Sequence, residues 1–169
     1  MSFPKAPTDV PASTPAFLVH EDDVPETEGR YRAPFDAESL SWERNLGRAA
    51  GTVNFGLRRE RLPPGKRMSF THAHSEEEEL AYVLRGECFV RIIEPGREPR
   101  EHALRAGHTV SFPAGTGIAH TFVNRGTSDC VILCFGERKD EADRVFYPED
   151  PDYDEDMAQH HSHYHWKRD

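Results

Sequence analysis

The sequence has few cysteines, no long apolar run and no excess of positive charge, and each of these absences excludes a class of protein. Its 169 residues include three cysteines, Cys88, Cys130 and Cys134, and none of them stands in a CxxC pair. An odd number of unpaired cysteines argues against a disulfide framework and fits a reducing compartment. Buried apolar packing is the expected role of these thiols, although one near a bound metal is a second possibility.

Charge and hydropathy exclude two kinds of partner. The chain carries 21 basic and 30 acidic residues, a formal net charge of -9, which disfavours a nucleic-acid-binding protein or one that binds an anionic membrane surface. No window approaches the roughly 20 apolar residues that a membrane span needs, and the opening MSFPKAPTDV does not resemble a signal peptide. We therefore expect a cytoplasmic protein.

Strand signals occupy the middle of the chain. Short alternating apolar segments separated by turn residues every 8 to 12 positions are typical of an all-β barrel or jelly roll. We expect an irregular N-terminal arm over residues 1–45, a barrel over residues 46–137 and an acidic, then histidine-rich tail over residues 138–169. No helical period is sustained, and residues 37–45 are expected to form a helical turn or a bend.

Three histidines and one glutamate form a candidate metal site. His72 and His74 are two positions apart, so on a strand both side chains project from one face and can bind the same cation. Glu79 follows a short acidic turn, and His120 comes from a different strand. Imidazole nitrogens with one carboxylate oxygen suit Fe, Mn, Ni, Co or Zn better than Ca or Mg.

The residues around these ligands resemble the two signature motifs of the cupin superfamily. The first motif is matched by Gly65, His72, His74, Glu79 and Gly86, and the second by Gly107, Pro113, Gly115, His120 and Asn124. One extra residue before His72 and two extra residues before His120 fall in turns, where added length costs little. The resemblance implies a double-stranded β-helix with one divalent metal ion inside, and it singles out Glu79 from its acidic neighbours.

The resemblance also gives an expected pocket. Apolar residues lining the barrel would exclude water from the metal, and the candidates are Phe55, Val83, Phe122 and Leu133. The inward face of the strand over residues 129–135 stays open between Val131/Leu133/Phe135 and Cys130/Ile132/Cys134. Tyr82 and Glu78 are the candidates for an additional acid or base, while Tyr82 and Leu84 are expected to face outward.

Two functions remain open at this point. The first is a metal-dependent enzyme that acts on a small polar organic molecule by dioxygenase, isomerase or lyase chemistry. The second is a non-catalytic binding or sensing protein whose metal is structural or anchors a ligand. The outward apolar residues and the N-terminal arm favour a homodimer. The tail histidines His160, His161, His163 and His165 are read as a solvated terminus, since no fold around them would order a second metal site.

Overall fold

The computed structural model describes residues 15–167, and the first 14 residues of the expected arm lie outside this range. Three sheets are present in the described chain, and their strands pair antiparallel. The larger sheet runs in the order β1 (Thr27–Glu28), β2 (Trp42–Asn45), β3 (Phe55–Leu62), β10 (Cys130–Glu137), β5 (Glu79–Arg85), β8 (Thr109–Phe112). The second contains β7 (Arg100–Arg105), β6 (Glu87–Ile93) and β9 (Ala119–Val123), and the third pairs β11 (Val145–Phe146) with β4 (Ala73–His74).

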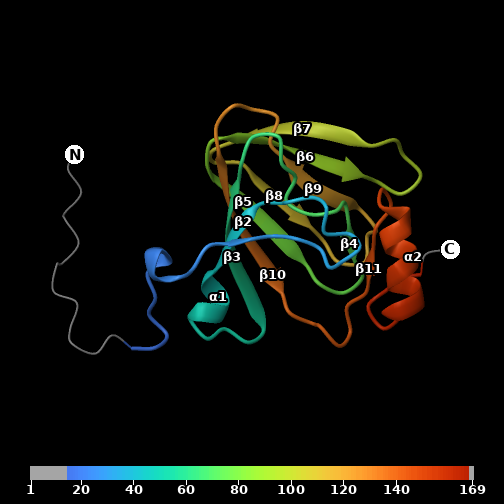
Figure 1. Ribbon diagram of the computed structural model, residues 1–169, viewed down its shortest axis with the longest axis horizontal. Helices are drawn as coiled ribbons and strands as arrows, with labels where there is room; N and C mark the ends of the chain where they lie inside the picture. The colour runs from blue at the N-terminus through green and yellow to red at the C-terminus, as the bar shows by residue number, and fades with distance from the viewer. Residues whose placement is uncertain (1–14, 168–169) are drawn as a thin grey trace.

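The two larger sheets enclose the main hydrophobic core (Figure 1). On β5, Ala81 and Val83 are buried while Tyr82 and Leu84 are 38% and 49% exposed, which is the alternation expected for a strand with one face on the core. Each fully buried large apolar side chain contributes about 1.5–3 kcal/mol. The all-β jelly-roll barrel predicted from the strand pattern is therefore confirmed. No helix in the described part of the chain is long and apolar enough to span a membrane.

The inward faces of β3 and β10 differ from the expected ones. On β3 the buried residues are Leu62 and Glu60, so Phe55, an odd number of positions away, points outward and is 48% exposed. On β10 Cys130 and Ile132 are fully buried in the core, and the alternation places Leu133 on the opposite face. The expectation that Phe55 and Leu133 line the interior is therefore wrong, because parity from a buried neighbour, and not local hydrophobicity, decides the face.

The three cysteines are free, and Cys88 and Cys130 are buried in the core, as expected for apolar packing. Residues 42–45 form strand β2, which extends the larger sheet next to β3. The helical turn or bend expected over residues 37–45 is therefore replaced in its second half by a strand. Two short helical segments, η1 (Glu21–Asp23) and α1 (Leu46–Ala49), flank this added edge.

A helix that the sequence pattern did not predict, α2 (Pro151–His160), packs beside β11 (Figure 1). Its Tyr153 and Met157, four positions apart and hence on one helical face, form a second buried cluster with Phe70 and Tyr147. From the N-terminal arm, Tyr31 stacks on Phe70 with ring centroids 3.8 Å apart. The arm and the tail thus cover the segment that leads into β4 and fix its position.

Asn124, the last residue of the second motif, is a buried polar residue whose side chain connects two backbone segments by hydrogen bonds. Its side-chain amide donates to the carbonyl oxygens of Leu62 and Ser128, both at 2.8 Å, and its Oδ1 accepts from the Gly126 amide at 2.8 Å. The side chain is fully buried. It therefore ties the end of β3 to the turn between β9 and β10.

Asn124→Ala is expected to lower the free energy of unfolding by about 2–4 kcal/mol, because three backbone groups lose a buried partner. Urea denaturation followed by fluorescence measures this loss. Asn54→Ala, at an exposed position, serves as the control and should change stability by less than about 0.5 kcal/mol. Equal stabilities of the two variants would contradict a stabilising role for the Asn124 hydrogen bonds.

Candidate metal centre

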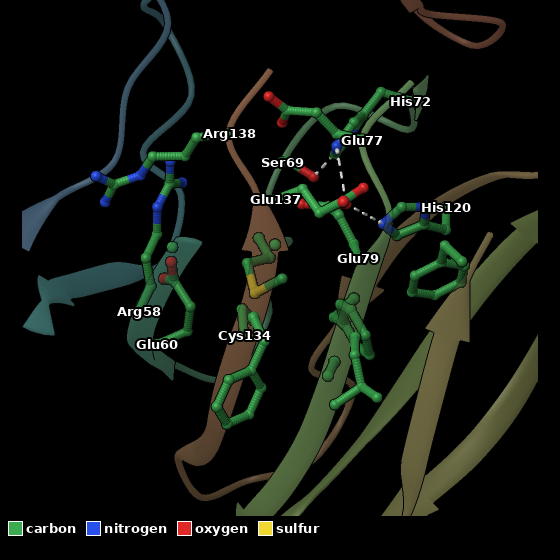
Figure 2. A pocket seen from close by; sticks show the side chains of 18 of the residues that line it. Arg58, Glu60, Ser69, His72, Glu77, Glu79, His120, Cys134, Glu137 and Arg138 are labelled. Carbon is green, nitrogen blue, oxygen red and sulfur yellow. Dashed lines mark hydrogen bonds and ion pairs between the residues drawn. The ribbon is translucent and has the colours of Figure 1, made fainter. Parts of the chain in front are cut away.

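The four expected ligands form one cluster, and Figure 2 shows three of them, His72, Glu79 and His120, turned toward one another. His74 lies on β4, His120 on β9, and Glu79 begins β5. His72 is held against His120 by two backbone hydrogen bonds of 3.1 and 2.8 Å. The pairing of distant strands therefore brings the two motifs together.

The distances within the cluster suit a single ion. The Nε2 atoms of His120, His74 and His72 lie 3.0, 3.7 and 3.8 Å from the same Glu79 carboxylate oxygen. Metal–nitrogen and metal–oxygen bonds are about 2.0–2.2 Å long, so ligand atoms on one ion are about 3–4 Å apart. The three spacings to the Glu79 oxygen have this size. The ligand atoms of His72, His74 and Glu79 also lie within 4.8 Å of one another, and His120 joins this group through its 3.0 Å contact with Glu79.

Hydrogen bonds orient two of the imidazoles for metal binding. His72 Nδ1 donates to the Phe70 carbonyl oxygen at 2.7 Å, and His74 Nδ1 donates to an Asp143 carboxylate oxygen at 2.6 Å. Each bond places the ring proton on Nδ1 and leaves the Nε2 lone pair directed at the cluster. The donor atoms present therefore fit a divalent transition metal ion.

Electrostatics favour the same protonation states. Burial, together with the neighbouring imidazoles of His120 and His74, lowers the pKa of His72 to about 3, so this ring is neutral at physiological pH. Burial opposes ionisation of Glu79, but the hydrogen bond from His120 and the surrounding histidines hold its pKa well below the usual range. The glutamate is thus a carboxylate and His72 a neutral ligand.

His120 is oriented by stacking. Its ring lies parallel to that of Phe112, with centroids 3.4 Å apart and an interplanar angle of 4°. Its Nδ1 atom is buried without a hydrogen-bond partner in the described part of the chain. Packing against an aromatic face therefore replaces the hydrogen bond that holds the other two rings.

Asp143 is a site residue that the sequence did not reveal. It is 5% exposed, and besides His74 it accepts hydrogen bonds from the amides of Glu76 and Glu77 at 2.9 and 3.2 Å. Burial lowers the pKa of His74, but the bond to Asp143 and the charge of Glu79 outweigh it and the pKa is raised. Asp143 lies in the C-terminal segment, 69 positions from His74, so no local spacing marks it.

A cavity of about 480 Å³ opens beside the cluster. Of the expected lining residues, Phe122 lines it, whereas Val83 lies in the core beneath. Its walls are more polar than expected, with charged side chains that the sequence reasoning did not select: Arg48, Arg58, Glu60 and Arg138. From β10, Cys134 and Phe135 both line the cavity, one from each of the two faces that the sequence left open.

The remaining candidates lie away from the cavity or serve other contacts. Tyr82 is 38% exposed on the outer face of β5, and neither it nor Glu78 lines the cavity. His102 and His108 are exposed, as expected for surface residues. In the tail, His165 Nε2 lies 3.0 Å from an Asp154 carboxylate oxygen of α2.

Comparison with known proteins agrees with the fold. A family model described as the cupin domain matches residues 58–136, a range that contains all four ligand residues. Residues 58–136 form a cupin domain. Among curated protein sequences, this cupin has no significant match.

Several solved structures resemble this cupin. One is a sugar phosphate isomerase of the cupin superfamily from Silicibacter pomeroyi. It has 27% sequence identity and a TM-score of 0.68, and the match covers 78% of this chain and 82% of that chain. A second is the polyketide cyclase RemF from Streptomyces resistomycificus. It has 25% identity and a TM-score of 0.57, and the match covers 86% of this chain and 96% of that chain. A predicted oxalate decarboxylase from Thermotoga maritima, at 21% identity, a TM-score of 0.55 and coverage of 71% and 97%, shares the fold.

Asp143→Asn is expected to weaken metal affinity about 10- to 100-fold, because an amide holds the Nδ1 proton of His74 less strongly than a carboxylate does. Competition with a coloured chelator measures the affinity. Asp152→Asn, on the exposed side of α2, is the matched control. Unchanged affinity in the Asp143 variant would show that His74 needs no such partner.

Proposed function

We propose that this cupin is a metal-dependent isomerase of small hydroxy-carbonyl compounds that carry an anionic group, with sugar phosphates as the substrate class. The observation that carries the proposal is the convergence of three imidazoles and one carboxylate beside a cavity of about 480 Å³. Such a cavity has the size of a small-molecule site. The similarity to a sugar phosphate isomerase at 27% identity supports this class over dioxygenase or lyase chemistry.

The ligand set would hold one divalent ion, and the candidates are Fe, Mn, Ni, Co and Zn. When bound, such an ion acts as a Lewis acid toward a carbonyl or hydroxyl oxygen of the substrate. Phe112 and Phe122 line the cavity next to His120 and exclude water from this position. The protein therefore supplies both the ligands and a partly apolar wall.

Arginines supply positive charge on another side of the cavity (Figure 2). Arg58 on β3 lies 3.5 Å from a Glu43 carboxylate oxygen, and Arg138 donates to the Thr52 carbonyl oxygen at 3.0 Å. Neither contact uses all the donors of a guanidinium, which has five. These side chains can bind a phosphate or carboxylate while the rest of the substrate faces the metal ligands.

His72→Ala is expected to reduce bound metal from about one equivalent per chain to less than about 0.1, and to reduce isomerase turnover at least about 100-fold. Elemental analysis after reconstitution with each metal, followed by turnover of aldose and ketose phosphates, provides both measurements. His108→Ala, at an exposed position, is the control. A His72 variant with full metal content and turnover would refute the site, and binding of sugar phosphates without turnover would establish the alternative of a non-catalytic binding protein.

We also propose that the chain forms a homodimer through the outer face of the larger sheet. Apolar side chains gather there on three neighbouring strands: the exposed Phe55, Leu80, Tyr82 and Leu84, and the half-buried Phe135. Register places Phe135 beside both Leu57 and Leu80, so the apolar residues form a continuous surface. Contiguous surfaces of this kind commonly mark protein interfaces.

Sedimentation equilibrium should therefore give about twice the chain mass of 19.3 kDa. Replacing Leu84, which is 49% exposed, with Asp should shift the protein toward the monomer, because a charge would be buried in the interface. Glu87→Gln, at an exposed position outside this surface, should leave the mass unchanged. A wild-type mass near 19.3 kDa would exclude the dimer.

A further inference from the structure

Glu60 is a buried carboxyl group that the metal site does not use. It lies on β3 between Arg58 and Leu62 on the inward face, is 5% exposed, and lines the same cavity as the metal ligands. Figure 2 draws Cys134 between Glu60 and Glu79, and the partly buried Cys134 thiol is close enough to interact with the charges of both carboxylates. Glu60 therefore belongs to the functional cavity while being separate from the metal ligands.

The contacts of Glu60 do not explain its presence as a structural residue. Its side chain accepts one hydrogen bond, from the Ser41 hydroxyl at 2.7 Å, and no cationic group in the described part of the chain lies within ion-pair distance. Arg58, two positions away on the same strand, forms an ion pair with Glu43. Burying an acid without a cationic partner is unfavourable, so such a group in a cleft is a candidate for chemistry.

Burial is the main influence on the protonation of Glu60. Burial raises its pKa to about 7, with a smaller opposing effect from the Ser41 hydrogen bond. The other charged groups that act on it are Glu43 on β2, Arg58 on β3 and Glu26 in the N-terminal arm, while the Cys134 thiol faces it from β10. A carboxyl group in this state exchanges protons near neutral pH, which general acid–base catalysis requires.

We propose that Glu60 is the group that carries the proton between the two carbons of the hydroxy-carbonyl substrate. This inference rests on the proposed isomerase function. The Glu60 carboxylate removes the proton from the carbon that bears the hydroxyl group, and the electron pair of that C–H bond forms the C=C bond of an enediol as the carbonyl oxygen takes a proton from water. Glu60 then returns its proton to the neighbouring carbon, and the original hydroxyl oxygen gives its proton back to water and becomes the new carbonyl. Atoms and electrons balance without an oxidant or a further reactant.

Glu60→Gln tests the assignment, because glutamine keeps the shape and the Ser41 contact but cannot take up a proton. The metal-loaded protein is incubated with aldose and ketose phosphates in D₂O, and deuterium at the exchanging carbon is followed by NMR. The variant should lose at least about 100-fold in turnover and in deuterium incorporation, with bound metal and the dissociation constant for the sugar phosphate unchanged. Glu87→Gln, at an exposed position on β6, should match the wild type.

Ser41→Ala provides a second, independent readout. The base must be ionised, so wild-type turnover should rise with pH through about 7. Removing the hydroxyl that stabilises the carboxylate should move this rise to higher pH while the rate at the plateau is retained. A profile that does not move would contradict a role for Glu60 as the titrating base.

Stability shows whether the variant protein is intact. The folded-state pKa of Glu60 is raised above the ordinary value of 4.5, so between about pH 4.5 and 7 the folded protein binds more protons than the unfolded chain. The free energy of unfolding therefore falls as pH rises through this range. Glu60→Gln should therefore melt higher than the wild type at pH 8 by more than it does at pH 5. If the wild type turns over sugar phosphates and Glu60→Gln is equally active, the assignment of Glu60 is wrong but the proposed function stands. If the wild type neither turns over nor binds sugar phosphates, the proposed function and this assignment are both wrong.

Discussion

The convergence of three imidazole Nε2 atoms on one Glu79 carboxylate oxygen is the interaction on which the remaining structure depends. The atoms lie 3.0–3.8 Å from that oxygen, and His72 and His120 are fixed by backbone pairing between segments almost 50 positions apart. Such a cluster forms only when the strands that carry it pair in the correct register, since a slip of one residue turns every side chain to the other face. The fold and the site are therefore specified by the same set of hydrogen bonds.

Much of the site could be predicted because its information is local. His72 and His74 share a strand face at a spacing that is visible in the sequence, and glycines such as Gly86 mark turns that require an unusual backbone. At Gly86, φ is +81° and a Cβ atom would lie 2.6 Å from the Asp129 carbonyl oxygen, so no other residue fits without strain. The motif glycines and the ligand residues can therefore be recognised in the sequence, because their positions in the structure require these residue types.

The parts that escaped prediction depend on contacts between distant segments. Asp143 reaches His74 from the C-terminal segment, and α2 is stabilised by burying Tyr153 and Met157 against Phe70, not by a long apolar period of its own. Phe55 and Leu133 were assigned to the interior on hydrophobicity, although the sheet buries Glu60 on that face and leaves Phe55 outside. A buried acid is contrary to ordinary hydrophobic patterning, and such exceptions are expected where function and stability conflict.

Apolar and charged side chains occupy different parts of the barrel around the cavity. Apolar residues fill the barrel interior beneath the metal ligands, while arginines and Glu60 line the part of the cavity away from them. The N-terminal arm and α2 cover the segment that carries His72, so residues outside the matched domain hold the ligands in place.

The most direct test of this account is X-ray absorption at the metal edge of the reconstituted wild-type protein, which reports the atoms bonded to the ion. The account predicts one ion per chain, with scattering from three imidazole rings and one carboxylate oxygen at about 2.0–2.2 Å. A spectrum with fewer than three imidazoles, or with thiolate sulfur as a ligand, would contradict it.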